Sequence, residues 1–106
     1  MKEIIIYKTK MNKCPYLDWH DSLNISVKAR IDKRIERVSQ GNFGDFKKIS
    51  NNISELRFKF GSGYRIYFSE LEDTIILFLN GGDKSNQSKD IKTAENYFED
   101  FKERFL

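Results

Sequence analysis

The sequence predicts an α+β fold in a single domain, residues 1–106. The expected architecture is a small antiparallel β-sheet with N-terminal helices packed on one face and a C-terminal helix. Three observations predict it. Residues 55–68 alternate polar and apolar side chains, as half-buried strands do. Two segments, 24–39 and 86–105, carry apolar stripes at helical spacing. The length of 106 residues is that of one ordinary domain.

The N-terminal part predicts a strand followed by two helices. Residues 3–8 (EIIIYK) form an apolar run typical of a short strand. Residues 14–22 predict a short helix with Pro15 near its start, where proline is tolerated. A longer helix is expected over 24–39, ended by Gly41. Its apolar stripe, at steps of four, four, four and three, consists of Leu23, Val27, Ile31, Ile35 and Val38.

A β-hairpin is predicted in ELRFKFGSGYRIYF, residues 55–68, after a turn-rich connection over 41–52. A three-residue loop, Gly61-Ser62-Gly63, would join its two strands. The predicted apolar pairs are Phe60 with Tyr64, Phe58 with Ile66, and Leu56 with Phe68. On the opposite face, Lys59 would lie across from Arg65 and Arg57 across from Tyr67.

A third strand is expected over 74–80, after a turn at 70–73. The predicted pairs are Phe68 with Ile75, Ile66 with Leu77, and Tyr64 with Leu79. This register puts Phe78 on the same face as Arg65, where it would stack on a base or a guanidinium. The last helix, 86–105, presents an apolar stripe that predicts docking on the core or on a partner.

Four basic residues are expected on one face of this sheet: Arg57, Lys59, Arg65 and Lys84. Like charges opposite each other destabilise a sheet, so the pattern calls for an explanation. One interpretation is an ordinary solvated face with Glu55 as counter-ion. The other is an anion site, most naturally for phosphate. The net charge of +3 permits a polyanionic partner without requiring one.

Several other site classes do not fit the sequence. GGDKS in residues 81–85 lacks the spacing of a nucleotide-binding P-loop. The single cysteine and single histidine, Cys14 and His20, give no zinc spacing, so no metal or cofactor is expected. One cysteine makes no internal disulfide, which favours an intracellular, cytoplasmic location. No apolar run reaches the roughly 20 residues that span a membrane, and the N-terminus lacks a signal-peptide pattern.

The basic face suits RNA cleavage without a metal. A cationic cluster binds phosphates and stabilises the charge that develops on a pentacoordinate phosphorus. The adjacent 2′-OH must be activated as nucleophile, and the 5′-oxygen must be protonated as it leaves. Arginine serves poorly as a base, whereas lysine can transfer protons where neighbouring cations lower its pKa. Lys59 and Lys84 are therefore the candidates for proton transfer, with Arg57 and Arg65 as clamps. Tyr67 is a further candidate for substrate binding.

Three segments resemble the RelE/ParE superfamily of toxins from bacterial toxin–antitoxin modules: GNFGDFKKI, ELRFKFGSGYRIYF and IILFLNGGDKSNQSKDI. Within it they are most similar to the addiction module killer proteins, related to the HigB-type toxins. The resemblance covers nearly the whole chain. It implies a cytoplasmic toxin that arrests growth by ribosome-dependent, metal-independent cleavage of mRNA. It also implies a cognate antitoxin, commonly a helix-turn-helix protein, through which alone the toxin would reach operator DNA.

The resemblance assigns the superfamily's basic site positions to Arg57, Lys59, Arg65 and Lys84. The sequence departs from some relatives in one respect, because residues 85–96 contain no aromatic side chain after the last strand. Lys84 or Tyr67 would have to take over that role. ParE-type members inhibit DNA gyrase without this basic set, so gyrase inhibition is the alternative function. A module that only binds its antitoxin is a third possibility.

Overall fold

The computed structural model describes residues 1–106 and contains every helix and strand that the sequence predicts, together with a further strand, β2. The strands are β1 (Glu3–Ile6), β2 (Phe46–Lys48), β3 (Ser54–Arg57), β4 (Arg65–Glu72) and β5 (Ile75–Gly82). The helices are α1 (Pro15–Asp21), α2 (Ile25–Ser39) and α3 (Gln87–Phe105), with a 3-10 turn, η1 (Lys84–Asn86), before α3. The strand β2 lies in the connection that was expected to be irregular, and all three of its residues are exposed.

Local sequence signals set the helix ends. Pro15 is the first residue of α1. Asn24 caps α2, because its side-chain oxygen accepts a hydrogen bond of 3.0 Å from the backbone N–H of Val27. The helix α2 ends at Ser39, with Gln40 as its C-cap immediately before Gly41, as expected. These signals explain why the helix boundaries follow the sequence closely.

The five strands form one mixed sheet in the order β1-β5-β4-β3-β2. Strands β3, β4 and β5 pair antiparallel, as expected, and the unpredicted β2 pairs antiparallel with β3. The edge strand β1 instead pairs parallel with β5, with Glu3 beside Ile75 and Ile6 beside Phe78. The expectation of a purely antiparallel sheet is therefore wrong for its first strand.

The strand registers differ from the predicted ones. In the β3–β4 pair, Leu56 lies opposite Ile66 and Arg57 opposite Arg65, a shift of two residues that keeps each side chain on its predicted face. In the β4–β5 pair, Phe68 lies opposite Phe78, and an irregularity follows before Tyr67 meets Asn80. The predicted pairing of Phe68 with Ile75 is wrong by three residues, an odd number, so Ile76 to Leu79 lie on the faces opposite to those predicted. Asn80, beyond the irregularity and opposite Tyr67, keeps its predicted face.

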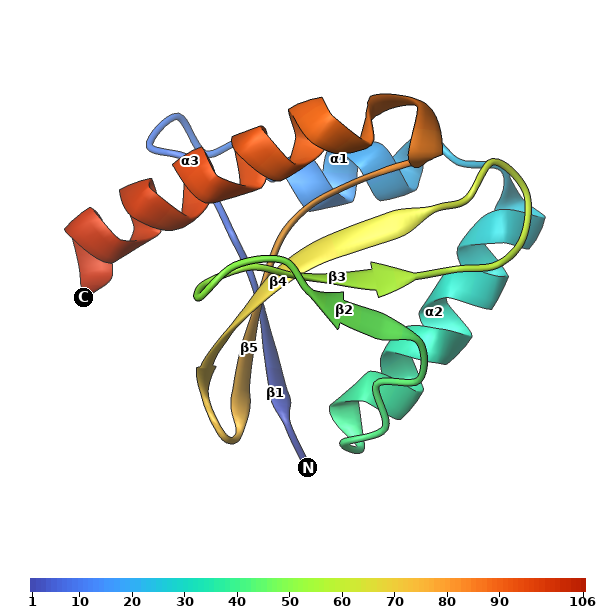
Figure 1. Ribbon diagram of the computed structural model, residues 1–106, viewed down its shortest axis with the longest axis horizontal. Coiled ribbons are helices and arrows are strands. Elements are labelled where there is room, and N and C mark those ends of the chain that lie inside the picture. The colour runs from blue at the N-terminus through green and yellow to red at the C-terminus, as the bar shows by residue number, and fades with distance from the viewer.

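Hydrophobic cores lie on both faces of the sheet. Figure 1 shows α2 and α3 on different sides of the strands, with the C-terminus at the far end of α3. The core beneath α1 and α2 consists of Tyr16, Ile31, Val38, Leu56, Phe58, Ile66, Phe68, Ile76 and Phe78. The core beneath α3 consists of Tyr7, Ile53, Tyr67, Leu77, Leu79, Ala94 and Phe98. None of the helices has the length and apolarity that crossing a membrane requires.

Candidate functional site

Two arginines face each other across neighbouring strands on the side of the sheet that α3 covers. Arg57 ends β3 and Arg65 begins β4, and they are direct partners in the ladder. The side chain of Arg57 is 35% exposed, and that of Arg65 is 13% exposed. Paired like charges oppose sheet formation, so the structure must compensate for them.

The compensation comes from Glu55, whose side chain is completely buried. Its Oε2 lies 3.0 Å from Nε of Arg57, and its Oε1 lies 3.5 Å from Nε of Arg65. The first residue of α3, Gln87, donates a hydrogen bond of 3.0 Å from Nε2 to Oε1 of the same carboxylate. A buried charge is tolerated when it is paired and hydrogen-bonded in this way. Glu55 therefore fixes the guanidinium group of Arg57 and the start of α3 by hydrogen bonds, and it pairs with Arg65 through charge alone, because Nε of Arg65 has no hydrogen-bond partner.

Lys84 approaches the same arginines from η1. Its backbone N–H donates to the carbonyl of Ser62 at 3.2 Å, which joins the start of η1 to the loop between β3 and β4. Gly63 in this loop has φ +77°, and a side chain there would meet both the Lys84 side chain and Nη1 of Arg65. Arg65 Nη1 donates to the carbonyl of Gly63 at 2.7 Å. We call Arg57, Arg65 and Lys84 the basic cluster; Glu55 pairs with its two arginines, and the backbone bond to Ser62 places its lysine.

Lys59 lies outside the basic cluster, so its predicted pairing with Arg65 is wrong. The ladder ends at Arg57, and Lys59 falls in the loop that leads to β4. Its side chain is 85% exposed and lies 3.9 Å from Asp45. Together with residues of α2 it lines a separate hollow, which includes Arg30, Lys33, Arg34 and Arg37.

The two aromatic residues predicted to bind substrate are both buried. Phe78 is 1% exposed and packs on Tyr16 beneath α1, with ring centroids 5.2 Å apart. The register of β5 turns it to the face opposite Arg65, so the predicted stacking of Phe78 is wrong. Tyr67 shares the face of Arg65 but is completely buried, and its hydroxyl has no hydrogen-bond partner. Burial, reinforced by Glu55, raises the pKa of Tyr67, so the phenol keeps its proton.

Two aspartates adjoin the basic cluster. Asp83 accepts hydrogen bonds from the hydroxyl and backbone N–H of Ser85, which hold the pKa of Asp83 below its ordinary value. Asp90, in the first turn of α3, has a raised pKa because of burial and the nearby charge of Asp83. The cluster is therefore a set of positioned cations beside carboxylates and is not an unopposed positive patch.

The sequence predicted that Arg57, Arg65 and Lys84 share one face, with Glu55 as a possible counter-ion. It did not indicate the contact of Gln87 with Glu55 or the close approach of Gly63 to Arg65 and Lys84. The alternation of residues 55, 57 and 65 places those side chains on one face. Nothing in the sequence indicates that Gln87 reaches Glu55, 32 positions away. No group of three or more His, Cys, Asp or Glu side chains is arranged to hold a metal ion.

Comparison with known proteins identifies the family of the chain. A model of the family described as phage derived protein Gp49-like (DUF891) matches residues 18–105. An uncharacterized protein of Haemophilus influenzae is 47% identical over 72 residues, which are 68% of this chain and 73% of that protein. The matched range includes β2 to β5, α3 and all residues of the basic cluster. The chain therefore belongs to the Gp49-like family, a family of toxins from toxin–antitoxin modules, which implies a cognate antitoxin as its partner.

Proposed function

We propose that this toxin is a HigB-like mRNA interferase: an endoribonuclease that cleaves mRNA on the ribosome without a metal ion and so inhibits translation. The observation that carries the proposal is the pairing of Arg57 with Arg65 around the buried carboxylate of Glu55. Two guanidinium groups in fixed positions suit the oxygens of a phosphate, because each presents N–H donors in a planar fork.

The roles of the basic cluster follow from its geometry. Arg57 and Arg65 would clamp the scissile phosphate and stabilise the negative charge that develops on its oxygens. The 2′-hydroxyl would release its proton to solvent as its oxygen bonds to phosphorus and the bond to the 5′-oxygen breaks, which leaves a 2′,3′-cyclic phosphate and a 5′-hydroxyl. Lys84 is exposed beside Arg65, and its ammonium group is suited to give a proton to the leaving 5′-oxygen.

Dependence on the ribosome accords with the burial of Tyr67 and Phe78. Because neither ring is available to stack on a base, the cluster needs another source of substrate orientation. The ribosome would present the mRNA backbone in a fixed geometry. Translated mRNA would then be cut, whereas free RNA would not.

The test is to map RNA 3′ ends after induction of the toxin in cells. Wild-type toxin should produce new ends within translated regions. Arg57→Ala and Lys84→Ala should lower their number by about 10²-fold or more, as loss of one charge-stabilising group does in other enzymes. Lys59→Ala is the matched control and should cleave like the wild type. Intact mRNA during growth arrest by the wild type would contradict the proposal.

Gyrase inhibition is the second candidate. The burial of both predicted stacking residues favours it, since a toxin that blocks gyrase needs no contact with a base. A DNA supercoiling assay in the same cells separates the two functions. Loss of supercoiling activity with intact mRNA would identify the gyrase-directed toxin.

A further inference from the structure

The open edge of the sheet has unused backbone hydrogen-bonding groups. β1 pairs with β5 on one side only. Glu3 and Tyr7 donate their backbone N–H groups toward β5, to the carbonyls of Thr74 at 2.7 Å and Phe78 at 2.9 Å. Successive N–H groups of a strand point to opposite sides, so those of Ile4 and Ile6 point to the open edge. Such an edge is a template for another strand.

Hollows flank this edge on both faces of the sheet. The larger one, about 500 Å³, lies on the α3 side and includes Ile5, Phe101 and Phe105. The other, about 240 Å³, lies on the side of α1 and α2 and is mostly apolar, with Ile4, Ile6, Tyr16, Leu17, Ile35 and Phe78 in its lining. Side chains of an added strand alternate between the two faces and would enter both hollows. A helix laid on one face would reach only one of them.

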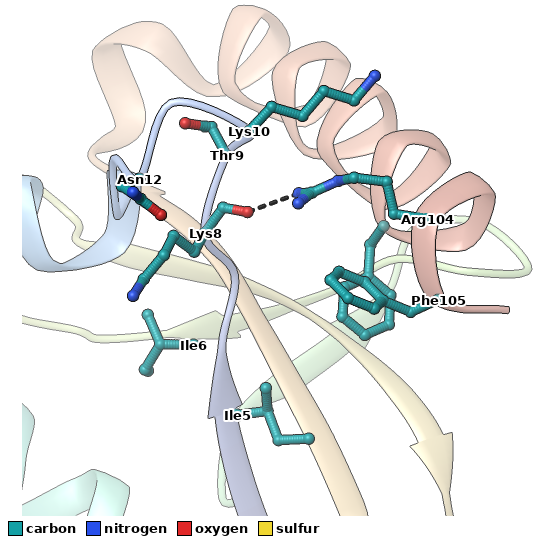
Figure 2. A pocket seen from close by; sticks show the side chains of 9 residues that line it. Ile5, Ile6, Lys8, Thr9, Lys10, Asn12, Arg104 and Phe105 are labelled. Carbon is teal, nitrogen blue, oxygen red and sulfur yellow. Dashed lines mark hydrogen bonds between the residues drawn. The ribbon is translucent and has the colours of Figure 1, made fainter.

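The rim of the larger hollow is basic. Lys8 and Lys10 are exposed, and Arg104 reaches over from α3 to donate a hydrogen bond of 2.6 Å to the carbonyl of Lys8. Figure 2 shows these side chains above Ile5 and Ile6, where β1 continues into the following loop. Asp100 is the neighbouring acid, 3.8 Å from Lys10 and 2.7 Å from Arg104. Three cations and one carboxylate leave this end of the groove positive.

We propose that the open edge of β1 receives an extended segment of the cognate antitoxin as an added strand. The segment carries apolar residues at adjacent positions, for the hollows on the two faces, and acidic residues where it passes Lys8 and Lys10. The proposal rests on the assignment of the chain as a toxin with an antitoxin, and it does not depend on which target the toxin attacks. It leaves the basic cluster accessible, because Arg65 on β4 lies two strands away from β1 and Arg57 on β3 lies three strands away.

The edge is also apolar where α3 ends. Phe105 is 63% exposed, and its ring lies 5.0 Å from that of Phe101. Exposed aromatic side chains beside an open strand suit a partner that buries them. The apolar end of α3 and the strand edge together define a continuous docking surface.

The first experiment measures binding of the full-length antitoxin encoded beside the toxin gene to purified toxin variants. The double variant Lys8→Glu/Lys10→Glu should bind about tenfold or more weakly, because rim charges then repel an acidic segment. Phe105→Glu should also weaken binding. Lys33→Glu changes an exposed lysine on α2 and is the matched control, with unchanged affinity expected. Thermal melts verify that each variant is folded.

The second measurement locates the contact by amide hydrogen exchange. Exchange at Ile4 and Ile6 should slow in the complex, since their N–H groups become hydrogen-bonded. In cells, the Lys8→Glu/Lys10→Glu variant should stay as toxic as the wild type but resist neutralisation. Wild-type affinity in both edge variants, unchanged exchange at β1, or an antitoxin that does not bind would each overturn the proposal. Slowed exchange in toxin alone at high concentration, with dimers present, would identify a second copy as the occupant and also overturn it.

Discussion

At the scale of single residues, the candidate site depends on Glu55. Its carboxylate is completely buried and interacts with Arg57, Arg65 and Gln87, which belong to two strands and a helix. No water is needed to satisfy it. The residue therefore stabilises the fold, orients the guanidinium group of Arg57 through a hydrogen bond and balances the charge of Arg65.

Replacing Glu55 with alanine should destabilise the protein strongly. Arg65 is only 13% exposed and would lose its carboxylate partner. Breaking a buried ion pair from one side typically costs about 3–5 kcal/mol. Denaturant unfolding measures the loss. Glu70→Ala is the control, because it removes an exposed glutamate from the neighbouring strand β4. It should change the free energy of unfolding by about 0.5 kcal/mol or less.

Removal of the Asp90 carboxylate should stabilise the protein, whereas removal of the Glu55 carboxylate should destabilise it. Because its folded-state pKa is raised, the folded protein binds this proton more tightly than the unfolded chain does. Stability is therefore greater in acid and falls as pH rises through the raised pKa. Asp90→Asn should raise Tm at neutral pH, and the gain should shrink below the ordinary aspartate value of 3.8. A lower Tm at neutral pH would show that the favourable interaction of the charged Asp90 side chain with the dipole of α3 dominates instead.

The residues of the site could be predicted only in part. Alternation alone places Glu55, Arg57 and Arg65 on one face, and a register shift of two leaves that result intact. The predicted position of Lys59 is wrong because it required the β3–β4 ladder to continue beyond Arg57. The loop instead begins there, and a short sequence signal does not fix where a hairpin ladder ends.

At the scale of elements, β5 shows why register was lost. Its residues Ile76 to Leu79 are buried on both faces, since helices cover the sheet from either side. A strand without polar alternation carries no information about which face each side chain takes. β4 is also buried on both faces from Ile66 to Ser69, but Arg65 and Tyr67 alternate with Ile66 and Phe68, so β4 kept its predicted faces, whereas Ile76 to Leu79 of β5 did not. The strand β2 was missed because its residues, all exposed, show no alternation.

The glycine pair of β5 allows two helices to pack closely against the strand. Gly81 and Gly82 are still within the strand. A side chain at Gly81 would overlap the ring of Trp19, and one at Gly82 would overlap the carboxylate of Asp90. The pair therefore allows α1 and α3 to approach the strand from opposite faces. Lys84 is brought to the cluster by that close packing.

Gly82→Ala should accordingly displace the start of α3. Overpacking of this kind typically costs about 1–3 kcal/mol, and the shift would also move Lys84 and lower toxicity. The double variant Gly82→Ala/Asp90→Ala makes room for the added methyl group. It should recover much of the lost stability in a denaturation experiment. If Gly82→Ala lowered the free energy of unfolding by the same amount in the wild type and in the Asp90→Ala variant, the proposed contact would be contradicted.

At the scale of the whole molecule, the two cores make the sheet a central layer. Phe58→Ala and Phe98→Ala remove buried rings from opposite faces, and each should cost about 3–5 kcal/mol. Phe105→Ala removes an exposed ring and should change stability by about 0.5 kcal/mol or less. Unfolding free energies of the three variants test this contrast. Similar losses in all three would mean that the end of α3 is packed more tightly than its exposure indicates.

The order of elements along the chain was predictable, but their arrangement in the sheet was not fully so. Each helix has its own periodic signal and capping residues, and the antiparallel strands follow one another in sequence. The partner of β1 lies about 70 positions later, at Ile75 to Phe78, and local patterns do not encode such a contact.

That long-range pairing has a consequence for how the toxin comes into being. β5, which joins the first strand to the rest of the sheet, is the last strand to be synthesised, and α3 follows it. While a ribosome is still making the chain, β1 has no partner and Gln87 has not reached Glu55. The nascent polypeptide therefore cannot assemble its basic cluster until β5 and the start of α3 have been made. Any activity that the cluster carries therefore appears only after α3 has begun to fold, when an antitoxin already present can capture the toxin.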